Sequence, residues 1–240
     1  MFTSKFKKAS LIAGSIFIIS IFAYILGWSS LLTVKSIEVS GTQSSNAITN
    51  ELMAKDLTLT VGMQLARVDI RGIKSTLSNM DWLGNYSVSR NWFSRKISLT
   101  VEEKTGIAKA IDTGGSILYF DKEGQLFKPI SAIQLGAMNN LPLVQTQSNA
   151  KSDLAEVAKL LQLLPADLTD LVSNLNGISV ANSGFISMGT KSGGRSIEII
   201  WGRADAIAQK SKVLLALLDL PENKAATKFD LSLPDSPIVS

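Results

Sequence analysis

The sequence predicts an α+β protein: a single N-terminal transmembrane helix, then a small β-α-α-β-β domain and a mixed β-rich domain with flanking helices. Three patterns carry this prediction. Residues 11–28 form an uncharged apolar run, several later segments repeat apolar residues three and four positions apart, and others alternate apolar with polar residues. These patterns are typical of transmembrane helices, amphipathic helices and half-buried strands, respectively.

The apolar run would form a helix about 27 Å long, close to the roughly 30 Å thickness of a bilayer hydrocarbon core. Lysines precede the run, and the next charged residue after it is Lys35. The positive-inside rule then predicts a cytoplasmic tail at residues 1–8 and a transmembrane helix at residues 9–28, with the C-terminus outside the cell membrane. A cleaved signal peptide is the alternative, but the run exceeds a usual signal core and no Ala-x-Ala site follows it.

Composition argues against several classes of function. The formal charge is +4, and it falls to +1 without the three N-terminal lysines, so no basic face indicates nucleic acid binding. The sequence contains neither cysteine nor histidine, which excludes Cys/His zinc sites and the commonest general base. The carboxylates are scattered, and the neighbours Glu102 and Glu103 would point to opposite faces of a strand. We therefore predict no catalytic residue, no metal site and no cofactor.

The sequence pattern in the middle of the chain predicts a domain at residues 34–103. A strand begins near Val34 and ends at Ser40-Gly41, and a helix follows it. Asp69 is a good N-cap for a second helix. Alternation at residues 86–92 and 97–102 then predicts two strands joined by a short turn.

The rest of the chain, residues 104–240, predicts a second domain. Strands are expected at 107–111, 117–120, 125–127, 177–181, 185–189 and 196–201, and helices at 152–164, 167–175 and 207–218. Apart from Leu141–Val144, residues 130–150 have little pattern and are expected to be loop. Asp205 and Lys210 are expected to be surface groups, and Trp82, Trp92 and Trp201 to lie in the core or at its margin.

The last strand is the strongest candidate for a binding site. Residues 228–233 alternate, and Pro234 and Pro237 prevent the strand from continuing. An edge position would leave backbone N–H and C=O groups open to a strand from another protein. An ordinary final strand that closes its own sheet would show the same alternation, and the residues alone leave both readings open.

Several motifs, in order and spacing, resemble the FtsQ/DivIB family of bacterial cell division proteins, especially its actinobacterial members. The part that resembles the family's POTRA domain contains Val34-x-x-Ile37-x-Val39-x-Gly41, Gly62-x-x-Leu65-x-x-Val68-Asp69 and Val88-x-Arg90-x-Trp92. The part that resembles its β domain contains Asp121-x-x-Gly124-x-x-Phe127, Gly202-Arg203, Lys210 and the ending from Phe229 to Val239. The sequence departs from the family at Trp92-Phe93, where the family has Trp-Pro, and at Lys104-Thr105-Gly106, where it has Arg-x-Pro.

The resemblance implies a non-enzymatic, membrane-anchored scaffold at the division septum. Such a protein would bind FtsB-like and FtsL-like proteins and help recruit and regulate the septal peptidoglycan synthase complex. The POTRA-like domain would be a second docking site. The alternatives are a membrane-anchored exported cell-wall enzyme, or a POTRA-bearing chaperone or transport component.

In the family, the terminal strand of the β domain receives a strand from the FtsB-like partner. This implies a partner-binding strand whose residues are Lys228, Phe229, Asp230, Leu231, Ser232 and Leu233, with Phe229, Leu231 and Leu233 on one face. On this reading, Leu231→Pro would remove a backbone donor and abolish partner binding in a pull-down. Unchanged binding by the folded variant would contradict it.

Overall fold

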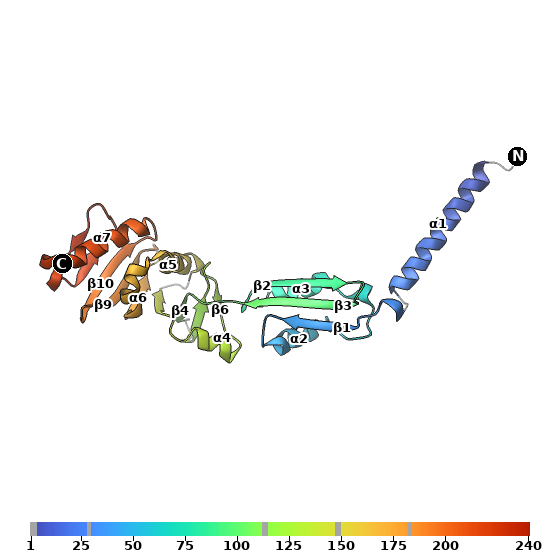
Figure 1. Ribbon diagram of the computed structural model, residues 1–240, viewed down its shortest axis with the longest axis horizontal. Coiled ribbons are helices and arrows are strands. Elements are labelled where there is room, and N and C mark those ends of the chain that lie inside the picture. The colour runs from blue at the N-terminus through green and yellow to red at the C-terminus, as the bar shows by residue number, and fades with distance from the viewer. Residues whose placement is uncertain (1–3, 28–29, 112–114, 147–149, 182–183) are drawn as a thin grey trace. The chain divides into compact units, whose positions relative to one another are not determined.

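The computed structural model describes residues 4–27, 30–111, 115–146, 150–181 and 184–240. The chain divides into two compact units, Met1–Glu103 and Lys104–Ser240 (Figure 1). Helices and mixed sheets together make it an α+β protein, as the patterns predict. Each unit has its own sheet.

The prediction of a transmembrane helix at residues 9–28 is wrong. The first helix, α1, covers Ser4–Gly27, but within the described ranges no helix combines the length and apolar character that a membrane crossing requires. The helix starts inside the segment expected to be a cytoplasmic tail, so it includes three lysines as well as residues 11–27 of the apolar run. The same finding overturns the expected single-pass localisation in the cell membrane. Trp28, the last residue of the predicted transmembrane helix, lies outside the described residues.

A three-stranded sheet with two helices forms the body of the first unit. Its strand order is β1-β3-β2, with β1 parallel and β2 antiparallel to the central β3. The elements are η1 (Ser30–Leu32), β1 (Ser36–Ser40), α2 (Ser45–Ala54), η2 (Leu65–Arg67), α3 (Ile70–Ser78), β2 (Leu83–Asn91) and β3 (Lys96–Glu103). The strand, helix, helix, strand, strand order predicted from the sequence is therefore confirmed.

One face of this sheet is apolar because β3 alternates. Ile97, Leu99 and Val101 are buried, and the intervening residues are not. Buried side chains from α2 and α3, among them Ile48 and Leu77, complete this core. The predicted cap also forms, since the Asp69 carboxylate accepts hydrogen bonds from the backbone N–H groups of residues 71 and 72 at 3.1 and 2.9 Å.

The second unit is built on a nine-stranded mixed sheet in the order β12-β11-β10-β9-β8-β7-β4-β5-β6. The pairs β4–β7, β7–β8 and β10–β11 are parallel, and the others are antiparallel. The strands are β4 (Ala108–Ile111), β5 (Ile117–Phe120), β6 (Leu126–Phe127), β7 (Leu143–Thr146), β8 (Gly177–Val180), β9 (Ile186–Ser192), β10 (Arg195–Gly202), β11 (Lys228–Asp230) and β12 (Ile238–Val239).

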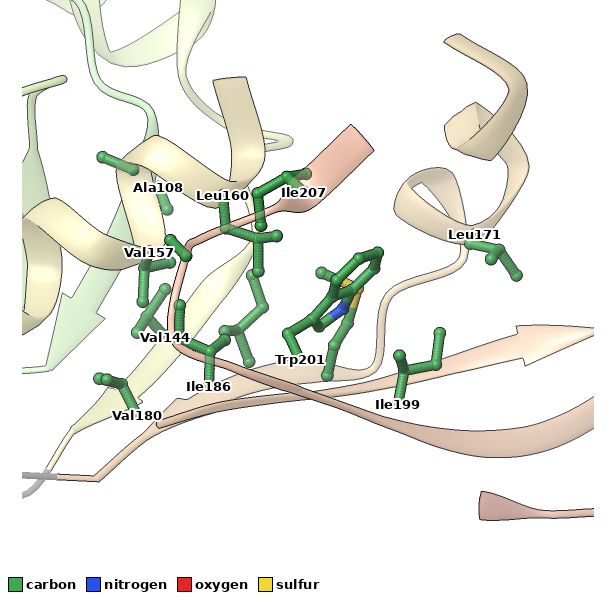
Figure 2. Packing of buried hydrophobic residues seen from close by; sticks show 14 of the residues in the cluster. Ala108, Val144, Val157, Leu160, Leu171, Val180, Ile186, Ile199, Trp201 and Ile207 are labelled. Atoms are coloured by element: carbon green, nitrogen blue, oxygen red, sulfur yellow. The ribbon is translucent and has the colours of Figure 1, made fainter. Parts of the chain in front are cut away.

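Helices lie in the connections between the parallel strands, and those that carry Leu160, Leu171 and Ile207 pack on the sheet. The helices are α4 (Ala132–Ala137), α5 (Lys151–Leu163), η3 (Ala166–Leu168), α6 (Thr169–Ser173), α7 (Ile207–Asp219) and η4 (Pro221–Ala225). Figure 2 shows the Trp201 ring between the sheet and the helices that carry Leu160, Leu171 and Ile207. Trp201 is 1% exposed and is one of the largest fully buried side chains. The core of this unit therefore lies between one sheet face and its helices.

Three local expectations need correction. Residues 130–150 are not only loop, because α4 lies within them and its Ser131 hydroxyl accepts a hydrogen bond from the N–H of Gln134. Helix α5 begins at Lys151, one residue before the expected start at Ser152. Trp82 and Trp201 are buried as expected, but Trp92 is 39% exposed, with the Arg90 guanidinium carbon 5.2 Å from its ring centroid.

Two glycines in the first unit allow a matched test of backbone constraint. Gly41 and Gly62 both have positive φ, +88° and +94°. A Cβ at Gly41 would collide with the backbone carbonyl of Val101, whereas a Cβ at Gly62 would meet open space. Gly62→Ala should therefore cost only the backbone strain, about 1–2 kcal/mol.

Gly41→Ala should lower the free energy of unfolding by about 1–3 kcal/mol more than Gly62→Ala, because it adds steric overlap to the same strain. Urea denaturation followed by circular dichroism measures both changes. Equal midpoints for the two variants would show that Val101 does not constrain this turn.

Candidate partner-binding edge of the sheet

The predicted binding strand, β11, lies inside the sheet rather than at its edge. On one side it pairs in parallel with β10, so that Ile199 lies opposite Phe229. On the other side it pairs with β12, so that Phe229 lies opposite Val239. The strand order therefore places β12, and not β11, at the outer edge of the sheet among the described strands.

The six predicted site residues differ in accessibility. Phe229 and Leu231 are fully buried in the core, and the Leu231 N–H donates to the Ile200 carbonyl at 2.8 Å. Asp230 and Ser232 are half-buried, and their side chains are joined by a 2.7 Å hydrogen bond. Lys228 is exposed and forms a 3.3 Å ion pair with Glu198, and Leu233 is 69% exposed. The structure does not bring the six side chains to one accessible face.

This placement changes how Leu231→Pro would act. Proline at residue 231 would remove the bond to Ile200, which belongs to the sheet itself, and would alter a buried side chain. Lost binding by that variant would therefore report damage to the sheet of the second unit. A test of partner binding needs a residue on β12.

Along β12, the backbone N–H and C=O groups of successive residues point alternately toward β11 and toward the open side of the sheet. Ser240 and Lys228 exchange two hydrogen bonds, at 3.1 and 3.0 Å, so they form a hydrogen-bonded pair. In an antiparallel ladder the next pair is not hydrogen-bonded across the strands. The N–H and C=O of Val239 therefore point away from β11, where an added strand would lie.

The side chains near this edge are partly apolar. Ile238 is 66% exposed, and Leu233, in the connection that leads to β12, is 69% exposed. Val239 is half-buried and packs against the core. An added strand would thus find one open backbone position together with exposed aliphatic surface.

Sequence reasoning missed β12 for a physical reason. The strand is only two residues long, and it follows Pro234 and Pro237, which were expected to prevent any further strand. A turn reverses the chain between the two strands, with the Ser236 N–H donating to the Leu233 carbonyl at 3.0 Å. Two apolar residues after a proline-containing turn are the only signal, and they are too few to define a period.

Lys210 fixes the connection that leads from β10 to α7. Its side chain is 1% exposed, and its ammonium donates to the carbonyls of Trp201 and Arg203 at 2.8 and 3.0 Å and to Asp205 Oδ1 at 2.6 Å. The expectation that Lys210 is a surface group is therefore wrong, because three acceptors compensate its buried charge. Asp205 is 68% exposed, as expected for a surface group.

The hydrogen bond from Lys210 is the main cause that lowers the pKa of Asp205, and the positive charge of Lys210 adds to it. A carboxylate with a lowered pKa in the folded state stabilises the fold above its unfolded-state pKa. This contribution is lost as pH falls through the lowered pKa of the folded state. The stabilisation is therefore fully present at neutral pH, and its dependence on pH is confined to acid solution below about pH 4.

Gly202 shapes the same connection at the end of β10. Its φ is +67°, and a Cβ there would lie 3.0 Å from the Cβ of Ser232. The register between β10 and β9 also shifts between Ile200 and Gly202. The absence of a side chain thus lets the segment after β11 pass close to the end of β10.

Comparison of the sequence with protein-family models gives no match, and no curated protein matches it. Within the ranges that the structure describes, no group of three or more acidic side chains is placed to hold a metal ion.

The Lys210 contacts predict an asymmetric pair of variants. Lys210→Met should lower the free energy of unfolding by about 2–4 kcal/mol, because two inward carbonyls lose their donor. Asp205→Ala should cost less, about 1 kcal/mol, because its carboxylate is 68% exposed and the buried Lys210 ammonium keeps its two carbonyl acceptors.

Thermal unfolding of both variants beside the wild type measures this difference. Equal losses would show that the ion pair, and not the carbonyl contacts, holds the connection.

Proposed function

We propose that this chain is a non-enzymatic scaffold of the bacterial divisome. It binds FtsB-like and FtsL-like proteins and helps recruit and regulate septal cell-wall synthesis. The partner adds a strand beside β12, at the end of the sheet in the second unit. The observation that carries the proposal is the outward orientation of the Val239 backbone at this edge.

The order of elements in the first unit supports the proposal. A POTRA-like domain was expected to have one strand, two helices and two further strands, and β1, α2, α3, β2 and β3 follow that order. The residues of the motifs occupy defined positions in it, since Val68 precedes the Asp69 cap and Val88 is buried in β2. Two edges of this smaller sheet, β1 and β2, offer further docking positions.

The topology of the second unit also supports the proposal. An added strand would extend an existing nine-stranded sheet, so its backbone would find a preformed template. Main-chain pairing supplies affinity in this mode, and alternate side chains supply specificity. The exposed Ile238 is the side chain best placed to select an apolar residue on the partner.

A proline at residue 239 tests this mode without removing a hydrogen bond inside the sheet. In Val239→Pro the lost N–H is the outward one, whereas the bonds between Ser240 and Lys228 remain. We expect the full chain with this change to lose capture of the FtsB-like protein of the same organism in a pull-down. The control, Val239→Ala, keeps the donor and should retain capture.

Circular dichroism of both variants checks that they are folded. Equal capture by folded Val239→Pro and by Val239→Ala would move the interface away from β12. Failure of the wild-type chain to capture either the FtsB-like or the FtsL-like protein would contradict the scaffold function.

A further inference from the structure

The second unit has a groove at the starts of three neighbouring parallel strands. Its volume is about 840 Å³, and its walls are Gly106, Ile107 and Lys109 at β4, residues 140–143 at the start of β7, Asn176 and Gly177 at β8, and parts of α5 and α6. The strands β9, β10 and β11 separate β8 from β12 in the sheet order, so this groove is distinct from the candidate edge. Its volume lies in the range of about 300–1,000 Å³ that is usual for ligand sites.

The groove has an apolar floor that remains partly open. The aliphatic residues that line it are all half-buried, neither sealed in the core nor fully exposed: Ile107, Leu141, Leu143, Leu161, Val172 and Leu175. Exposed apolar surface gathered in a concave site is a mark of binding sites. The floor therefore favours a ligand with aliphatic side chains.

The rim carries amide groups. Asn140, Gln162 and Asn176 line the groove and are exposed. A carboxamide has both a donor and an acceptor, so it can pair with the N–H and C=O of a peptide backbone. A rim of amides above an aliphatic floor matches a peptide, whose backbone is polar and whose side chains can be apolar.

The charge of the groove indicates one further feature of the ligand. Of the described residues that line it, Lys109 is the one cation, and none is a carboxylate. The Lys109 ammonium donates to the Asn139 carbonyl at 2.9 Å, and an ammonium has three donors in all. A carboxylate beside Lys109 would therefore gain a charge-assisted hydrogen bond without facing a like charge.

We propose that this groove binds an apolar peptide segment that ends in a free carboxylate, with the carboxylate at Lys109. The aliphatic side chains of the peptide lie on the floor, and its backbone pairs with the rim amides. The proposal does not depend on the divisome function, because neither β12 nor its partner takes part.

The test uses two synthetic hexapeptides, acetyl-Ser-Leu-Val-Leu-Ala-Leu with a free carboxylate and the same peptide with a C-terminal amide. Isothermal titration calorimetry on the full chain should show about tenfold tighter binding of the free acid, since only it pairs with Lys109. Binding of neither peptide, or of both equally, would overturn the proposal.

Variants of Lys109 separate its charge from its shape. Lys109→Gln keeps a donor for the Asn139 carbonyl but has no charge, so it should bind both peptides equally. Lys109→Arg should restore the preference for the free acid. Lys122→Gln changes an exposed lysine in a turn and serves as the matched control, which should leave both affinities unchanged. A preference that survives in Lys109→Gln would overturn the assignment of the carboxylate.

A floor variant and a lipid probe complete the test. Val172→Asp should weaken both peptides, because it places a charge on the apolar floor. Dodecanoate has a carboxylate but no peptide groups, so it should bind more weakly than the free-acid peptide. Tighter binding of dodecanoate would assign the groove to fatty acids and overturn the peptide assignment.

Discussion

The parallel pairing of β10 with β11 is the constraint on which the candidate edge depends. Parallel neighbours cannot be joined by a tight turn, so the chain must cross over the sheet, and α7 makes this crossover. Lys210 holds its start through two backbone carbonyls, while Gly202 lets the returning chain pass close to β10. The crossover brings Phe229 into the core, and the short antiparallel strand β12 then becomes the last in the sheet.

Much of the fold could be predicted because its signals are local. The alternation of Ile97, Leu99 and Val101 and the cap at Asp69 each reflect the chemistry of a few neighbouring residues. The transmembrane prediction failed at α1 because it was based on the apolar run alone, whereas the helix also contains the lysines that precede the run. The burial of Lys210 could not be read from the sequence either, because its acceptors are backbone carbonyls whose positions depend on the folded connection.

The edge strand β12 lies beside the strand predicted at residues 228–233, but its own residues were not predicted. Alternation identifies a strand at Lys228, yet it carries no information about which strands lie on either side. The structure buries Phe229 and Leu231 and places Ile238 and Val239 outside them. Edge position depends on pairing between distant segments, and a two-residue strand has no period of its own. The groove beside Lys109 was not predicted for a similar reason, since its walls come from separate parts of the chain.

Hydrogen exchange at the end of the chain tests strand addition at β12 most directly. In the free protein the Val239 amide, which points outward, should exchange faster than the Phe229 amide inside the sheet. Addition of the proposed FtsB-like partner should slow exchange at Val239 by about tenfold or more, because the amide gains an acceptor. A complex that forms while Val239 exchange stays unchanged would contradict strand addition at this edge.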